Sequence, residues 1–118
     1  MVDQRDQPQS TGHRVLVCDV DNLPDGEVIR VPREETGADD AIAVFNDGGR
    51  FHAVNDTCTH SSASLSEGWV EDGHVECPLH GGTFCLRTGR ATGAPATVDA
   101  ITHGVEVHEG AVWLLPRR

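Results

Sequence analysis

The chain has 118 residues, of which 37% are hydrophobic, and nine basic against nineteen acidic residues give it a formal net charge of −10. This length suits one domain with a modest core and leaves no room for a second catalytic unit. The apolar runs are far shorter than the roughly 20 residues that cross a bilayer, and the charge repels nucleic acid and anionic lipid, so we expect neither partner.

The acidity has two readings: it steers the chain to a partner with a basic face, or it only maintains solubility. The first twelve residues have no apolar core and lack the central feature of a secretory signal. We therefore expect a flexible N-terminus over 1–12, one domain over 13–118 and a cytoplasmic location. In such a compartment, Cys thiols are more often metal ligands or core residues than disulfides.

Short alternating runs rich in Val recur along the chain, and no long stretch has the apolar spacing of a helix. This pattern favours an antiparallel all-β fold. Residues that tolerate positive φ mark tight turns at 46–49, 72–73 and 109–110. Between the turns we expect strands over 13–20, 27–31, 40–46, 50–55, 69–70, 74–76, 101–108 and 111–115.

Two segments, 57–68 and 77–95, escape this pattern because they are dense in Ser, Thr, Gly and Pro. They are ordered loops only if something holds them. The first contains a C-x-H motif and the second a C-x-x-H motif, so each loop offers one thiolate and one imidazole. A diiron cluster with two Cys on one iron and two His on the other needs this donor set. The motifs predict one [2Fe–2S] cluster, bound by Cys58, His60, Cys77 and His80.

Zinc is the main competing metal, because two Cys and two His also complete a closed tetrahedral site. Structural zinc sites usually place their first pair of ligands two to four residues apart, whereas a single residue separates Cys58 from His60. Zinc is therefore the less favoured alternative. A zinc-bound interaction module would be colourless and without redox activity.

The remaining Cys and His residues are interpreted as structural. Cys85 follows Phe84 in a short extended segment and is expected to be a packed core thiol rather than a ligand. Cys18 alternates with Leu16 and Val20, which predicts an inward strand position. None of the other histidines has a Cys partner at ligand spacing, so we expect surface or strand positions for His13, His52, His74, His103 and His108.

The motifs and their flanks resemble the Rieske family. The first motif continues into SLSEG at 64–68, and the second into GGTF at 81–84. From about residue 13 to 115 the chain is similar to the ferredoxins of bacterial aromatic-ring dioxygenases. The resemblance implies an antiparallel β-sandwich, a small loop-built cluster-binding lobe and a third, Pro-bearing loop over the cluster at 93–95. Gly81 and Gly82 then let the backbone approach the sulfides, although an ordinary turn also explains them.

The resemblance further implies an electron-transport protein without catalytic residues of its own. A flavin-containing NAD(P)H-dependent reductase would supply single electrons, and a terminal oxygenase in aromatic hydrocarbon catabolism would receive them. The alternative is the small Rieske-like subunit of an assimilatory nitrite reductase, which would copurify tightly with a large chain. A terminal oxygenase itself is excluded by length, because it needs a second domain for a mononuclear iron. We expect the chain to be a monomer.

The family also bears on the reduction potential, which for His-ligated clusters spans roughly −150 to +300 mV. In high-potential relatives, a Ser and a Tyr hydroxyl after the second His donate hydrogen bonds, and a disulfide joins the two loops. Here Gly82 and Phe84 occupy those places. The three residues after His60, which end at Ala63, include no Cys that could form the disulfide. We expect a potential near the low end of the range.

Overall fold

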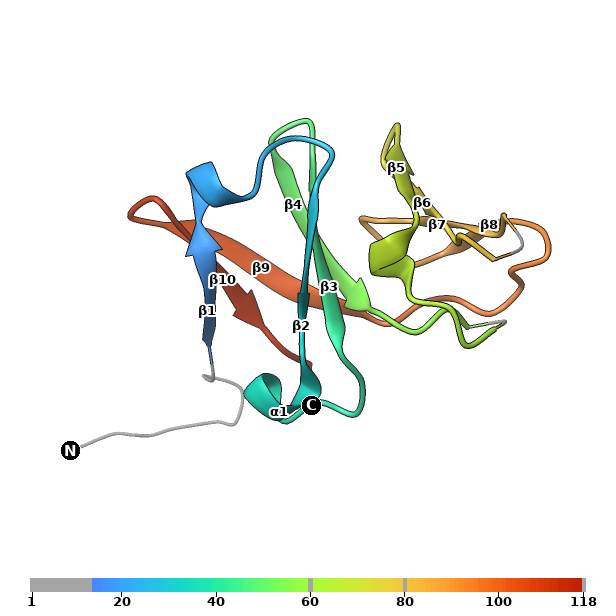
Figure 1. The fold of residues 1–118 in the computed structure, drawn as a ribbon, viewed down its shortest axis with the longest axis horizontal. Helices are drawn as coiled ribbons and strands as arrows, with labels where there is room; N and C mark the ends of the chain where they lie inside the picture. Colours follow the sequence, from blue (N-terminus) through green and yellow to red (C-terminus); the bar gives the residue numbers. More distant parts are fainter. Residues whose placement is uncertain (1–13, 60, 80, 118) are drawn as a thin grey trace.

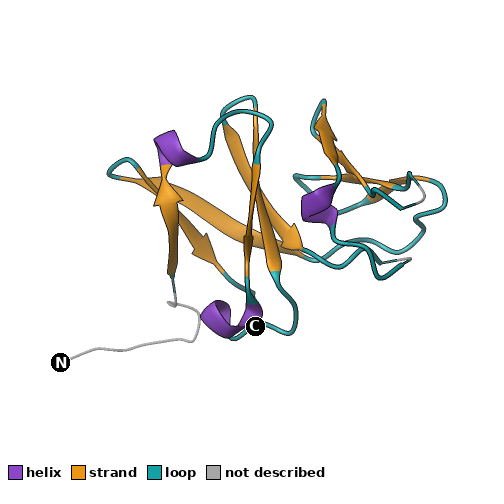
Figure 2. Cartoon of the chain, viewed as in Figure 1, coloured by secondary structure: helices purple, strands orange, loops and turns teal. Residues whose placement is uncertain are grey.

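The computed structural model describes residues 14–59, 61–79 and 81–117, which form an almost wholly antiparallel β structure, as predicted. The expected flexible segment 1–12 lies outside the described residues. Figures 1 and 2 show two groups of strands side by side. The larger sheet, called the base below, has the order β1-β10-β9-β4-β3-β2. Its strands are β1 (Val15–Asp19), β2 (Val28–Val31), β3 (Ile42–Asp47), β4 (Arg50–Asn55), β9 (Thr102–His108) and β10 (Ala111–Leu115).

The smaller sheet belongs to residues 57–100, called the small lobe below, which leave the base after β4 and return to it at β9. Its order is β5-β6-β7-β8, with strands β5 (Trp69–Glu71), β6 (His74–Glu76), β7 (Thr83–Cys85) and β8 (Ala91–Gly93). Helical structure in the described ranges is limited to η2 (Val20–Asn22), α1 (Arg33–Thr36) and η3 (Leu65–Glu67). No helix among them is long and apolar enough to cross a membrane.

The base encloses a core of its own. Strand β9 pairs with β10 along most of its length and with β4 through Thr102 and His103, so it joins the two halves of the sheet. Buried side chains from both halves meet between them, together with Leu23 from the connection between η2 and β2, at Val31, Ile42, Val44, Ala53, Val112 and Leu114. This packing of two antiparallel halves agrees with the expected sandwich.

Strand β3 separates this core from a second one beneath the small lobe. Its residues Ile42 and Val44 face the core of the base, whereas Ala43 and Phe45 face the small lobe. All four are completely buried. Because successive side chains of a strand point to opposite faces, a strand buried on both faces has a continuous apolar run rather than an alternating one. The small lobe is therefore fastened to the base by shared apolar packing.

The three predicted tight turns are confirmed. Each is a two-residue connection between paired strands, with both residues at positive φ: Gly48 and Gly49, Asp72 and Gly73, and Glu109 and Gly110. Two consecutive positive φ values suit the right-handed twist of the flanking strands.

Three local features differ from the sequence-based expectations. The segment 77–95 contains strands β7 and β8 rather than loop alone, and α1 was not predicted. Elements of three or four residues are too short to show a period, and no two-residue turn marks these as the turn at 72–73 marks β5 and β6. Leu16 is 55% exposed although it alternates with Cys18, because the register of β1 shifts between these two residues. Such a bulge reverses the facing of the residues on one side of it.

Candidate metal centre

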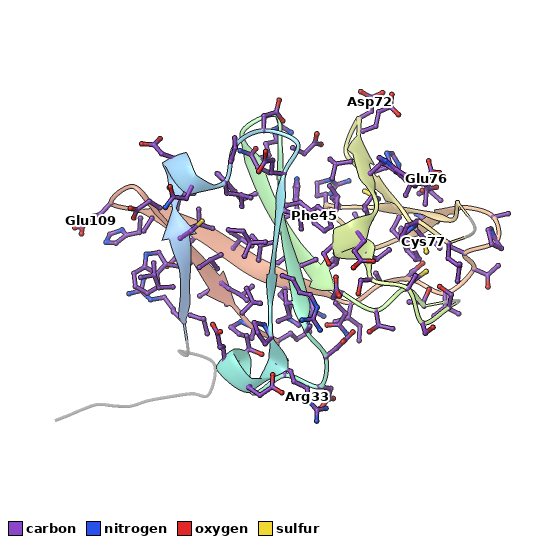
Figure 3. The ribbon with its side chains drawn as sticks, in the orientation of Figure 1. Arg33, Phe45, Asp72, Glu76, Cys77 and Glu109 are labelled. Carbon is purple, nitrogen blue, oxygen red and sulfur yellow. The ribbon has the colours of Figure 1, made fainter. Side chains whose placement is uncertain are left out.

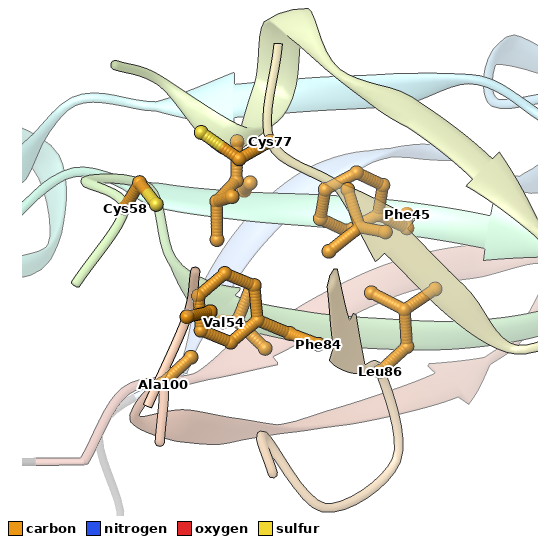
Figure 4. Packing of buried hydrophobic residues seen from close by; sticks show 11 residues of the cluster. Phe45, Val54, Cys58, Cys77, Phe84, Leu86 and Ala100 are labelled. Carbon is orange, nitrogen blue, oxygen red and sulfur yellow. The ribbon is translucent and has the colours of Figure 1, made fainter. Parts of the chain in front are cut away.

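Two of the four predicted ligands, Cys58 and Cys77, lie in the described part of the chain, and both belong to the core beneath the small lobe. Cys58 follows β4 and is 2% exposed, and Cys77 follows β6 and is fully buried. Figure 4 shows their sulfur atoms at one end of this core, with Phe45 and Leu86 toward the other end. His60 and His80 lie outside the described residues.

The first loop is anchored to the base by two carboxylates. The buried Asp56 accepts a hydrogen bond from the Ser66 amide at 2.9 Å, and the Arg30 guanidinium lies 3.1 Å from its other oxygen. Asp40 accepts hydrogen bonds from both the amide and the hydroxyl of Thr57, each at 3.0 Å. These bonds fix the backbone immediately before Cys58.

Backbone hydrogen bonds close both cysteine loops. In the first, the Cys58 amide donates to the Ala63 carbonyl at 2.9 Å. In the second, the Cys77 amide donates to the Gly82 carbonyl at 2.7 Å, and the Gly81 amide donates back to the Cys77 carbonyl at 3.1 Å. Gly81 has a φ of 77°, in the left-handed region that favours glycine. The backbone of this tight turn thus requires glycine at 81, whether or not a cluster lies beside it.

Side chains link the loops to one another. The Ser61 hydroxyl oxygen lies 3.8 Å from the Cys77 sulfur, and the Thr59 hydroxyl donates to the Val98 carbonyl at 2.6 Å. The second of these contacts joins the first loop to the segment that directly follows the third loop expected at 93–95. The loops therefore hold each other in addition to being held by the base.

The residues present fit an iron–sulfur group. One thiol comes from each of two closed loops, and both are withdrawn from water at the end of an apolar core. Thiolate sulfur is the donor that holds iron–sulfur clusters, and a shielded, hydrogen-bonded setting tunes their electronics. The clamp between two loops that the motifs predict is thus consistent with the positions of Cys58 and Cys77.

The other two cysteines are half-buried. Cys18 packs against the core of the base, where burial raises the pKa of its thiol. Cys85 is not the packed core thiol that was expected, because it alternates with the buried Phe84 and Leu86 and faces the other side of β7. Hydrogen bonding from the Thr88 side chain lowers the pKa of Cys85.

His103 has a role that sequence reasoning missed. It is 9% exposed, and its Nδ1 accepts a hydrogen bond from the Arg117 amide at 2.8 Å. Nε2 must then carry the proton of the neutral ring and donate it to the Asn55 side-chain oxygen, 2.7 Å away. Burial lowers the pKa of His103, and the Arg117 charge lowers it further. The partners come from distant segments, so no local motif marks them.

The surface of the small lobe is acidic and carries exposed apolar side chains. A groove of about 460 Å³ is lined by Trp69, Glu71, Asp72, His74, Glu76 and Thr83. Figure 3 shows Asp72 and Glu76 on the same lobe as Cys77, far from Glu109 at the opposite end of the molecule. Leu79, within the second motif, and Val98, beyond both motifs in sequence, are 53% and 61% exposed.

Comparison with known proteins matches this arrangement to a described family. The family profile of the Rieske [2Fe-2S] domain matches residues 13–109. The chain is 44% identical to the 3-phenylpropionate/cinnamic acid dioxygenase ferredoxin subunit of Escherichia coli K12, over 86% of this chain and 92% of that protein.

Solved structures extend the likeness to three dimensions. A chain in the complex of reduced oxygenase and oxidized ferredoxin in carbazole 1,9a-dioxygenase has a TM-score of 0.80 and 41% identity, covering 86% of this chain and 92% of that one. A Mycobacterium tuberculosis protein described as an NADH-dependent nitrite reductase small subunit has a TM-score of 0.76 but 24% identity, covering 90% of this chain and 96% of that one. The second likeness shows the fold alone.

Proposed function

The chain belongs to the Rieske [2Fe-2S] family, and on this basis we propose that it is the ferredoxin component of an aromatic-ring dioxygenase system. In this role it carries single electrons and catalyses no reaction itself. One [2Fe–2S] cluster would be held by Cys58, His60, Cys77 and His80, and when bound it stores one additional electron. A flavin-containing NAD(P)H-dependent reductase would be the donor, and a terminal oxygenase the acceptor.

One observation carries the proposal: two loops distant in sequence bring Cys58 and Cys77 to one end of a shared core. The thiols are buried there, so the protein excludes water from the side that they occupy. In sequence, His60 follows Cys58 by two residues and His80 follows Cys77 by three, so each predicted imidazole belongs to the same loop as one thiol. This spacing supports a site that both loops share, with its two thiols buried in the small lobe.

The exposed surface of the small lobe around Leu79 supports electron transfer to a docked partner. Leu79 directly precedes His80, and its exposed side chain offers apolar contact at the edge of the site. Acidic side chains line the groove beside Trp69 on the same lobe. A partner with a basic face around an apolar centre would complement this surface, and its approach would be steered by charge.

The likeness to relatives favours an oxygenase partner over nitrite reductase. The 44% identical relative is named as a dioxygenase ferredoxin subunit, and the 41% identical chain comes from a complex of an oxygenase with a ferredoxin. The likeness to a nitrite reductase subunit is a likeness of fold. The monomeric state stays a prediction, which light scattering of the purified holoprotein would measure.

The experiment that tests the function has two stages. Protein reconstituted anaerobically with iron and sulfide should hold two of each per chain and should give, after reduction, the low average g value of a His-ligated cluster. Stoichiometric zinc in place of iron would contradict the proposal. The holoprotein should then support NADH-dependent turnover when mixed with a dioxygenase reductase and its terminal oxygenase, without copurifying with a large sirohaem protein.

A further inference from the structure

The Ser61 hydroxyl reaches across from the first loop to a ligand of the second. Its oxygen lies 3.8 Å from the Cys77 sulfur, within the range of a hydrogen bond to sulfur. The Ala63 amide donates a hydrogen bond to the same oxygen at 3.3 Å. This amide occupies a lone pair of the hydroxyl oxygen, so the hydroxyl hydrogen of Ser61 stays available for another acceptor. A thiolate can only accept, so the hydroxyl donates to sulfur once Cys77 is ionised.

We propose that Ser61 sets the reduction potential of the site by donating a hydrogen bond to the Cys77 thiolate. This inference rests on the proposed function, because it requires a cluster bound by Cys77. Reduction adds one electron and one negative charge, and no bond forms or breaks. A donor to a ligand sulfur stabilises the more negative state more strongly, and therefore raises the potential.

Ser61 changes what the sequence implies about hydrogen bonding at the site. The two hydroxyl positions of high-potential relatives are filled here by Gly82 and Phe84, neither of which has a hydroxyl. Ser61 supplies a donor from the opposite loop instead. The Ser61 contact is long, so its hydrogen bond is weaker than a short, charge-assisted one. The potential therefore remains low, but it is higher than that of a site without this donor.

The geometry of the first loop holds Ser61 in place for this role. The Ser61 amide donates to the Cys58 carbonyl at 3.4 Å, and the Cys58 amide donates to the Ala63 carbonyl at 2.9 Å. The hydroxyl is thus fixed within a turn closed by the ligand residue itself. Its neighbour Ser62 is exposed, and its side chain makes no hydrogen bond within the described part of the chain, so it provides a matched control.

The test measures the midpoint potential of reconstituted holoprotein by voltammetry. Ser61→Ala should lower the equilibrium constant for reduction about threefold to tenfold, where tenfold corresponds to about 59 mV for a one-electron couple. Ser62→Ala should leave the midpoint at the parental value. Ser61→Thr and Ser61→Val have the same shape and differ in the hydroxyl, so the Thr variant should have the higher midpoint. Iron and sulfide contents should be equal in all of them.

The outcomes separate this inference from the function on which it rests. A Ser61→Ala variant with full iron and sulfide and an unchanged midpoint would overturn the role of Ser61 and leave the ferredoxin assignment standing. If that variant fails to hold iron, equal midpoints in the Thr and Val variants would overturn it in the same way. A parent protein that takes up no iron and sulfide would overturn both.

Discussion

Arg30 on β2 lies 3.1 Å from the buried carboxylate of Asp56, the residue at which the chain leaves β4 for the first cysteine loop. The Asp56 side chain is 2% exposed, whereas that of Arg30 is 55% exposed. The ion pair therefore has one face in water, and its Coulomb energy is partly screened. The second partner of Asp56, the Ser66 amide, lies across the loop, so one carboxylate ties both ends of the loop to the base.

Asp56→Ala should destabilise the protein by about 1–3 kcal/mol, because it leaves the Ser66 amide without its acceptor in a partly buried place. Arg30→Gln should cost less, because the ion pair that it removes is partly open to water and screened. Urea unfolding followed by circular dichroism measures both. Asp21→Ala, at an exposed residue of η2, is the control, and an equal midpoint for it and Asp56→Ala would contradict the anchoring role.

Cys58→Ser and Cys77→Ser should each abolish cluster binding, because each removes a buried thiolate that no neighbouring residue replaces in the proposed site. Cys18→Ser and Cys85→Ser should leave iron and sulfide contents unchanged. Both of these residues are half-buried and lie outside the two ligand motifs. Metal analysis and the visible spectrum of the four variants give the result. Loss of the cluster in the Cys85 variant would show that this thiol belongs to the site.

His103 should make folding stability fall as the solution becomes more acidic. Burial holds the pKa of His103 in the folded protein below its ordinary value of about 6.5. At pH values between the folded pKa and the ordinary one, the unfolded chain therefore binds more protons than the folded chain. Stability is therefore complete above about pH 6.5 and is lost as pH falls from there to the folded pKa, by at most about 1.36 kcal/mol per pH unit for one histidine. Asp40 opposes the shift, whereas the Arg117 charge reinforces it.

Amide exchange at Arg117 locates this effect. Protonation of Nδ1 removes the acceptor of the Arg117 amide, so the protection factor of that amide should fall over the same pH range. His103→Gln should abolish the pH-dependent step. His52, whose pKa burial also lowers, is the comparison, because His52→Gln should change global stability without altering exchange at Arg117. A pH-independent protection factor at Arg117 in the parent would contradict the account.

Gly68→Ala should destabilise the small lobe, because a Cβ at this position would collide with the backbone carbonyl of Glu76. That carbonyl belongs to the residue directly before Cys77, so relief of the clash must move backbone next to a predicted ligand. Gly26 provides the control. It has a positive φ of 83° but open space around it, so Gly26→Ala should cost only about 1–2 kcal/mol of backbone strain. Thermal unfolding of both holoproteins checks the difference.

The strands and tight turns could be predicted because their signals are local. Alternation marks β4 and β9, and the pairs at 48–49, 72–73 and 109–110 must adopt positive φ to join adjacent strands. The two cysteine motifs were equally visible, since their ligand spacing is short. Strands β7 and β8 were not visible, because three residues carry too little pattern by themselves and no two-residue turn marks this pair as it marks β5 and β6.

The contacts that hold the site could not be predicted because they join distant segments. Arg30 and Asp56 are 26 residues apart, Ser61 and Cys77 are 16 apart, and Asn55 and His103 are 48 apart. The first and third pairs consist of common polar residues without a motif around them, and the motif that contains Cys77 does not point to Ser61. They meet only through the pairing of strands in the base, such as β4 with β9 for Asn55 and His103, or through the folding of the small lobe, for Ser61 and Cys77. The sequence therefore indicates which residues bind the group, and the fold indicates which residues support and tune them.

Leu79→Trp should slow electron transfer to the oxygenase without altering the optical spectrum. The Leu79 side chain is 53% exposed, so a larger ring can be placed there without disturbing the core. It would nevertheless lie beside His80 in the chain, at the proposed docking edge, and would increase the separation between the site and its partner. Stopped-flow oxidation of the reduced protein by the oxygenase measures the rate.

Two further measurements, the salt dependence of association and a control variant on the base, test whether this edge is the docking surface. Association should weaken as salt is added, because an acidic surface steers a basic partner over a Debye length of about 10 Å at 0.1 M salt. Val107→Trp places the same ring on β9 of the base, at a residue that is 52% exposed, and should leave the rate unchanged. If both variants slowed transfer equally, or if Leu79→Trp had no effect at low salt, electrons would leave the protein elsewhere than at the edge around Leu79.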